Sequence, residues 1–170
     1  RPARSQIFLD HGDRRGAFYA LAAQASFVPP GRAEMFGRAL SAGVEGDFLV
    51  STYLLPPLIE HAVLVLLLRR GVVSGPLTEE EASRRYGLNA TLRGDLGDAV
   101  ADALGADVHF TLAALLVDRF GSNLRNAVAH GLLSDRGVYG YDAEYLWWLA
   151  LRLCCASYRG TPPPGFERRS

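Results

Sequence analysis

The chain has 170 residues, of which 49% are hydrophobic and 21% are charged, and its 18 acidic residues are balanced by 18 basic ones. These values are typical of a single soluble globular domain and exclude a fibre, a disulfide-rich mini-protein and a disordered chain. A net charge of zero also argues against a bulk nucleic-acid coat, because any contact with RNA or DNA must then come from a local patch.

Apolar residues recur at helical spacing between turn residues, which indicates an all-α fold. We expect helices over residues 14–26, 31–42, 46–70, 95–104, 107–120 and 142–158, and a short helix over 122–131 that Ser122 caps and Gly131 ends. The pair Pro56-Pro57 should break or kink the third helix, because proline lacks the amide hydrogen. Residues 1–160 should form one domain.

The other segments should be loops or surface structure. Residues 71–94 should be a loop with one short helix capped by Thr78, and residues 134–141 a loop. The proline-rich stretch 161–170 should be a disordered tail. Residues expected on the buried side of the 107–120 helix are Phe110, Leu112, Leu115 and Leu116. Trp147 and Trp148 should belong to the core and a dimer interface rather than to a base-stacking platform.

The cysteines and the longest apolar run bear on the compartment. Cys154 and Cys155 are adjacent, and neighbours in one helix point in different directions, so we expect no disulfide between them and a reducing compartment. The run 54–68 contains two prolines and falls short of the ~20 apolar residues of a membrane span. We therefore expect a core helix, no membrane contact and a cytoplasmic location, with no secretory signal visible.

Residues 122–131 read Ser-Asn-Leu-Arg-Asn-Ala-Val-Ala-His-Gly, and three polar residues of this stretch share one short helix: Arg125, Asn126 and His130. Asn126 and His130 share a face, and Arg125, roughly 140° from His130, can reach round with its long side chain. An imidazole, a permanently charged guanidinium and an amide form a minimal set for metal-free phosphodiester cleavage. A structural interpretation stays open, because such residues often cap a helix or interact with its last carbonyls.

Glu60 and His61 lie in the most hydrophobic predicted helix, where an unpaired charge is costly, so each should reach a partner or a cleft. We expect Glu60 to pair with Arg125, either as support for the site or as a purely structural contact. His11 and His109 have no companion at metal-ligand spacing, and we expect neither a metal nor a cofactor. Phosphate-binding glycine loops and a nucleophile elbow are missing from the sequence.

The Arg-Asn-x-x-x-His-Gly string of residues 125–131 resembles the signature of the HEPN superfamily (higher eukaryotes and prokaryotes nucleotide-binding), in which four to six residues separate Arg from His. The resemblance runs from Asp107 through Trp147-Trp148, includes a Phe-Gly-Ser-Asn-Leu lead at 120–124, and takes in 55–61. It is strongest with a branch of unknown function that often lies at the C-terminal end of longer chains.

The resemblance implies a HEPN-like bundle of four or five core helices with additional short helices, dimerised so that two signatures face one cleft. It implies a metal-independent endoribonuclease acting on single-stranded or looped RNA, in toxin–antitoxin, phage-defence or RNA-processing systems, with an antitoxin or regulatory protein as a further partner. By carry-over, His130 is the general acid or base, Arg125 stabilises the transition-state charge, and Asn126 orients these groups or the phosphate. A tyrosine that some toxin members carry two residues after the histidine is replaced here by Leu132. The alternative is a non-catalytic helical module that dimerises or binds a nucleotide or a partner protein.

Overall fold

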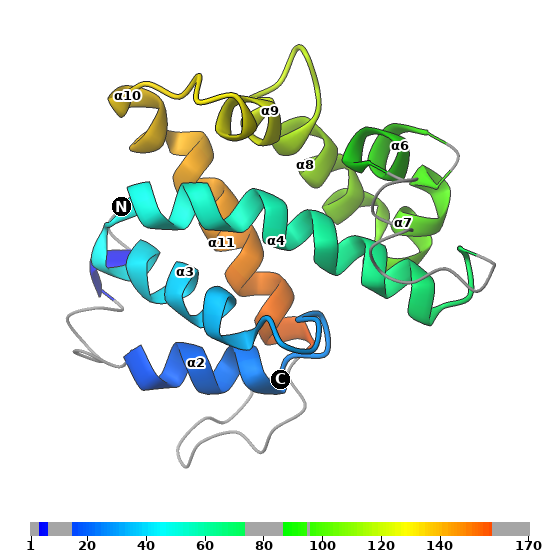
Figure 1. The fold of residues 1–170 in the computed structure, drawn as a ribbon, viewed down its shortest axis with the longest axis horizontal. Helices are drawn as coiled ribbons and strands as arrows, with labels where there is room; N and C mark the ends of the chain where they lie inside the picture. Colours follow the sequence, from blue (N-terminus) through cyan, green and yellow to red (C-terminus); the bar gives the residue numbers. More distant parts are fainter. Residues whose placement is uncertain (1–3, 7–14, 74–86, 95, 158–170) are drawn as a thin grey trace.

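A computed structural model describes residues 4–6, 15–73, 87–94 and 96–157 of the chain. Within these ranges the protein is an all-α bundle, which confirms the predicted fold class (Figure 1). The helices are α2 (Arg15–Gln24), α3 (Ala33–Glu45), α4 (Phe48–Arg69), α6 (Leu88–Arg93), α7 (Gly97–Leu104), α8 (Ala106–Leu116), α9 (Leu124–Ala129), α10 (Asp135–Val138) and α11 (Tyr141–Ala156).

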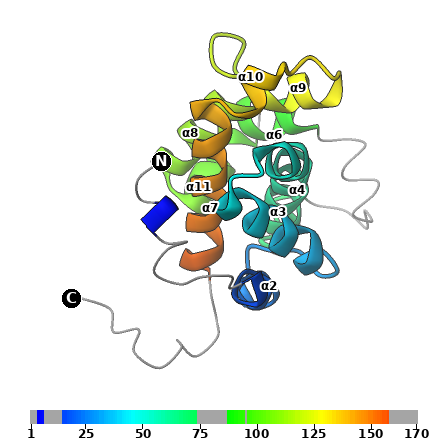
Figure 2. The same ribbon diagram turned by 90° about the vertical axis from the view of Figure 1, so that its left-hand side faces the viewer.

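Helix α4 lies in the middle of the bundle and contacts α3, α7, α9, α10 and α11. In both views α2 lies at one edge of the molecule, and α9 and α10 lie together at the opposite edge (Figures 1 and 2). Helix α3 separates α2 from α4, whereas α6, α7 and α8 pack together beyond the other half of α4 (Figure 1). The short signature helix α9 therefore sits on the rim of the bundle, supported by α4 and α8.

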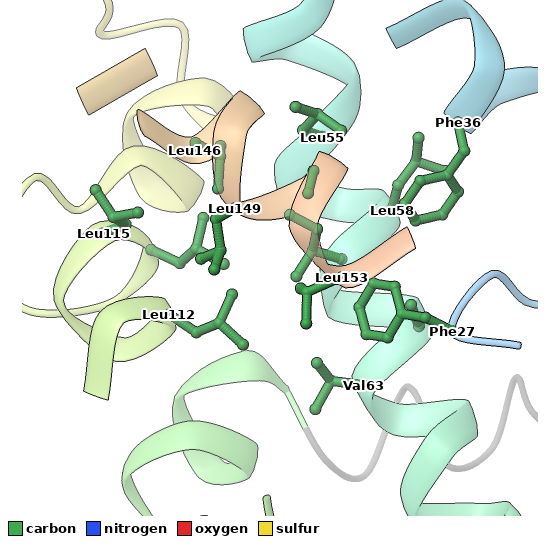
Figure 3. Packing of buried hydrophobic residues seen from close by; sticks show 14 of the residues in the cluster. Phe27, Phe36, Leu55, Leu58, Val63, Leu112, Leu115, Leu146, Leu149 and Leu153 are labelled. Carbon is green, nitrogen blue, oxygen red and sulfur yellow. The ribbon is translucent and has the colours of Figure 1, made fainter. Parts of the chain in front are cut away.

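The core is formed by apolar side chains from α3, α4, α8 and α11 that point toward one another (Figure 3). Its labelled members include Phe36, Leu55, Leu58, Val63, Leu112, Leu115, Leu146, Leu149 and Leu153. Burying one such side chain contributes about 1.5–3 kcal/mol relative to leaving it in water. Packing of this core fixes the relative placement of α4, α8 and α11, and hence the frame on which α9 rests.

Helix α4 continues through Pro56 and Pro57, so the predicted break at this pair is wrong. Asp47 begins the helix, and its carboxylate accepts a hydrogen bond of 3.2 Å from the amide of Val50. The neighbours Leu55 and Leu58 are buried against the rest of the bundle, and such burial offsets the backbone hydrogen bonds that the two prolines remove. By length and composition α4 could cross a membrane, but 56% of its most apolar window is buried inside the protein.

Helix α8 orients its side chains differently from the prediction at one position. Leu112, Leu115 and Leu116 are buried as expected, whereas Phe110 is 73% exposed, so its predicted burial is wrong. Phe110 lies about 200° round the helix from Leu112, which places it on the opposite face. Trp147 on α11 is fully buried, as predicted for a core residue.

Trp147 packs directly on helix α3. Its indole Nε1 donates a 2.9 Å hydrogen bond to the carbonyl oxygen of Leu40. A Cβ atom added at Gly43 would lie less than 3 Å from the indole ring, so only glycine leaves room for this approach. The next residue, Trp148, is partly buried and meets Trp147 edge to face, with 4.7 Å between the ring centroids.

Several other predictions can be compared with the described ranges. The segment expected as a loop at 134–141 contains the short helix α10, which begins where the Ser134 hydroxyl accepts a hydrogen bond from the amide of Gly137. Cys154 and Cys155 are both free thiols, as expected. The helix expected after Thr78 and the tail 161–170 lie outside the described residues. Helix α6 lies in the part of 71–94 that is predicted as a loop, so the loop prediction is wrong there.

Candidate active site

The signature helix α9 begins and ends with residues in the left-handed region of backbone conformation. Asn123 precedes it with φ 45° and ψ 38°, and Asn is the side chain that tolerates this region best after glycine. The expected N-cap at Ser122 is therefore wrong, since Asn123 holds the cap position and makes no side-chain cap hydrogen bond. Leu124 is buried and anchors the first turn.

Gly131 terminates α9, as the sequence predicts. Gly131 has φ 64°, and its amide donates to the carbonyl oxygen of Val128 at 3.2 Å. The amide of Leu132 donates to the carbonyl of Ala127 at 2.8 Å, which completes a Schellman motif around His130. These bonds fix the backbone on both sides of the histidine.

Arg125 forms an ion pair with Glu60 on α4, which confirms the predicted pairing. Arg125 Nε lies 3.1 Å from Glu60 Oε2, and the side chains are 41% and 21% exposed. The second carboxylate oxygen, Oε1, accepts a 3.1 Å hydrogen bond from the amide of Leu88, the first residue of α6. Among the described residues Arg125 uses only Nε in this network, so both of its terminal Nη groups remain available for an anion.

A pocket of about 360 Å³ opens beside Arg125. Its residues are Gly87, Leu88, Asn89, Leu116, Val117, Arg119, Asn123, Arg125 and Asn126. Buried Leu88, Leu116 and Val117 give the pocket an apolar side, while two arginines and three asparagines supply cationic and amide groups. Guanidinium groups bind phosphate oxygens, and amides can either donate or accept hydrogen bonds. This composition suits a phosphorylated, hydrogen-bonding ligand.

The structure brings together some of the predicted site residues and separates others. Arg125 and Asn126 line the same pocket, and Glu60 holds Arg125 from behind. His130 lies one turn further along, exposed to solvent, and is not among the lining residues. His61, the neighbour of Glu60, is partly buried and does not line the pocket.

Three polar lining residues were not predicted from the sequence: Asn89, Arg119 and Asn123. Arg119 and Asn123 flank the Phe-Gly-Ser segment before α9, so closeness to the signature was the only available signal. Asn89 comes from α6, about 35 residues earlier in the chain, and no sequence pattern marks it. By contrast, His109 makes a structural contact, because its Nε2 lies 2.7 Å from the carbonyl oxygen of Leu92.

Searches with protein-family models, curated proteins and solved structures found no match to this chain.

Proposed function

We propose that this domain is a metal-independent endoribonuclease of the HEPN type. The observation that carries the proposal is the position of Arg125, which Glu60 holds through Nε at the edge of a polar pocket that Asn126 also lines. A carboxylate behind an arginine limits its rotamers and leaves the Nη groups directed to a ligand. The exposed imidazole of His130 on the same short helix supplies the group that can move a proton.

The proposed reaction is attack of a ribose 2′-hydroxyl on the adjacent phosphorus. One imidazole accepts the hydroxyl proton, the bond from phosphorus to the 5′-oxygen breaks, and an imidazolium protonates the departing oxygen. The products are a 2′,3′-cyclic phosphate and a 5′-hydroxyl. Arg125 stabilises the additional negative charge on the phosphoryl oxygens, and Asn126 orients the phosphate or the imidazole.

Assembly of two chains would supply the two proton-transfer groups. Each chain has a single histidine in the signature, and in one chain His130 lies outside the pocket that holds Arg125. In the segment that follows α9 along the chain, four large apolar or aromatic side chains are exposed: Leu132, Tyr139, Tyr141 and Tyr145. Tyrosine is enriched in protein interfaces relative to the rest of the protein surface. We therefore propose a homodimer in which the α9 helices of two chains face a shared cleft, so that His130 of each chain approaches the pocket of the other.

The experiment is cleavage of labelled single-stranded RNAs and tRNA in EDTA, with oligomeric state measured by light scattering. The variants are His130→Ala, Arg125→Ala and, as a matched control, Arg38→Ala, which removes an exposed cation on α3. We expect the first two to lose about 10²–10⁴-fold in rate and the control to keep its rate. Equal cleavage by wild type and His130→Ala would refute the assignment.

A second candidate function, a non-catalytic module that dimerises or binds a nucleotide, is favoured by one observation. His130 does not line the pocket, so a single chain lacks a complete acid–base site. A well-folded dimer that cleaves no RNA in a broad panel would support this second function. RNA as substrate, a regulatory protein as partner and a cytoplasmic location all stay predictions.

A further inference from the structure

The aromatic ring of Phe120 is fully exposed on the loop between α8 and α9. This loop projects from the rim of the bundle beside α9 (Figure 1). Keeping a benzyl side chain in water forgoes about 1.5–3 kcal/mol that its burial would contribute. A flexible loop could fold such a ring back onto the protein surface, so the exposure of Phe120 depends on the interactions that hold this loop.

Asp118 holds the loop in a defined conformation. Its Oδ1 accepts a 3.1 Å hydrogen bond from the amide of Phe120, and its Oδ2 forms an ion pair with Arg93 of α6. The carbonyl of Asp118 accepts a further 3.1 Å bond from the amide of Gly121. Side chain and main chain of one residue therefore fix the backbone on both sides of the exposed ring.

The part of the loop that leads from Phe120 to α9 is held in place as well. The amide of Ser122 donates to the carbonyl oxygen of Ala114 at 3.1 Å. Gly121 passes so close to the same carbonyl that an added Cβ would lie less than 3 Å from it. The loop thus closes tightly onto the last turn of α8, and the backbone that carries the exposed ring of Phe120 is held in place.

The residues next to Phe120 belong to the candidate active site. Arg119 is exposed and lines the pocket, as does Asn123, and both lie in the same loop. Arg119 and Arg125 both line this pocket, so a chain of zero net charge places two cationic residues at one site. An exposed ring beside cations that bind phosphate is the combination that proteins use for single-stranded nucleic acid.

We infer that Phe120 stacks on an unpaired base of the RNA next to the phosphate held by Arg125, while Arg119 contacts the backbone. This inference rests on the proposed function and makes the loop the element that selects unpaired RNA. A base inside a duplex has both faces covered, so it cannot stack on Phe120. A protein partner fits less well, because the flanking Arg119, Gly121 and Ser122 form no continuous apolar patch.

The test measures binding of a fluorescein-labelled 2′-O-methyl RNA decamer, which lacks the attacking hydroxyl, in EDTA. The proteins are wild type, Phe120→Ala, Phe120→Trp and the matched control Phe110→Ala, which removes an exposed phenylalanine outside the pocket. A set of decamers with one abasic site moved along the strand locates the stacked base. Unmodified RNA of the same sequence is assayed for cleavage in parallel.

We expect Phe120→Ala to weaken binding by about 5- to 100-fold, Phe120→Trp to retain it and Phe110→Ala to leave it unchanged. One abasic position should weaken binding to wild type but not to Phe120→Ala. Stacking is refuted if Phe120→Ala binds and cleaves single strands as wild type does, and the proposed ribonuclease then stands.

Two further outcomes separate the proposals. If Phe120→Ala changes the oligomeric state but keeps the same RNA affinity per dimer, stacking is overturned and the ring is assigned to a protein contact. Wild type that neither binds nor cleaves would refute both the stacking and the ribonuclease.

Discussion

Replacing Gly43 by alanine should destabilise the protein, although alanine is the better helix former. Gly43 lies within α3 where the ring of Trp147 crosses it, and the added methyl group would lie less than 3 Å from that ring. Trp147 is fully buried and hydrogen-bonded to Leu40, so it has no free space into which to move. The methyl group must therefore displace α3, α11 or the indole.

The magnitude follows from three contributions. Overpacking of a dense core costs about 1–3 kcal/mol. Loss of the hydrogen bond from Trp147 Nε1 to Leu40 costs about 1 kcal/mol, and replacement of a helical glycine by alanine returns about 1 kcal/mol. We expect Gly43→Ala to lower the free energy of unfolding by about 1–3 kcal/mol, which for a chain of this size lowers Tm by roughly 2–12 °C.

The assay is urea unfolding followed by near-ultraviolet circular dichroism, which reports on the packing of buried tryptophan. Gly16→Ala is the matched control, because Gly16 lies in α2 with no atom within 4 Å of an added Cβ. This control should leave stability unchanged or raise it by about 0.5–1 kcal/mol. If Gly43→Ala proves as stable as Gly16→Ala, Trp147 does not pack on α3 as described.

Three further predictions concern the site and the thiols. A double-mutant cycle of Glu60→Gln and Arg125→Gln, measured by urea unfolding, should give a coupling energy of about 0.5–1 kcal/mol. The coupling should decrease in high salt because the pair is partly exposed, and zero coupling would contradict the ion pair. Asn123→Ala should destabilise by about 1 kcal/mol while Asn123→Gly does not, as thermal unfolding would show; equal effects would exclude the left-handed conformation. Burial raises the pKa of the Cys154 thiol from 9.0 to about 12, so between these values the thiol ionises in the unfolded chain but not in the folded protein. The free energy of unfolding should therefore fall by about 1.4 kcal/mol per pH unit from pH 9 toward pH 12. Cys154→Ala should lack this component, and parallel plots of unfolding free energy against pH for the two proteins would contradict it.

The helices were predictable where burial follows a simple period, and errors arose where local geometry decides. Leu112, Leu115 and Leu116 follow one face of α8, but Phe110 is off that face and was assigned to the core on hydrophobicity alone. The uninterrupted α4 depends on packing against α3 and α11, which a proline rule does not include. The left-handed cap at Asn123 depends on how the chain leaves α8, which no side-chain pattern encodes.

The candidate site was predictable in part for a similar reason. An acid in an apolar helix requires a partner, and the signature offered Arg125, so the contact with Glu60 followed from charge alone. The pocket brings Asn89 of α6 together with Arg119 and Asn123 of the loop after α8. Their convergence depends on how α6 and α8 pack together, and neither hydropathy nor spacing carries that information.

The carboxylate of Glu60 gives the site a probe that needs no RNA. One oxygen holds Arg125 and the other holds the amide hydrogen of Leu88, so the exchange of that hydrogen with deuterium depends on the same side chain that orients the arginine. Slow exchange at Leu88 would report a docked α6 and an ordered Arg125, and faster exchange would report release of the Glu60 side chain. Following this amide by NMR during titration with inorganic phosphate would show whether an anion at Arg125 strengthens or weakens the hydrogen bond between Glu60 and the amide of Leu88, before any substrate is identified.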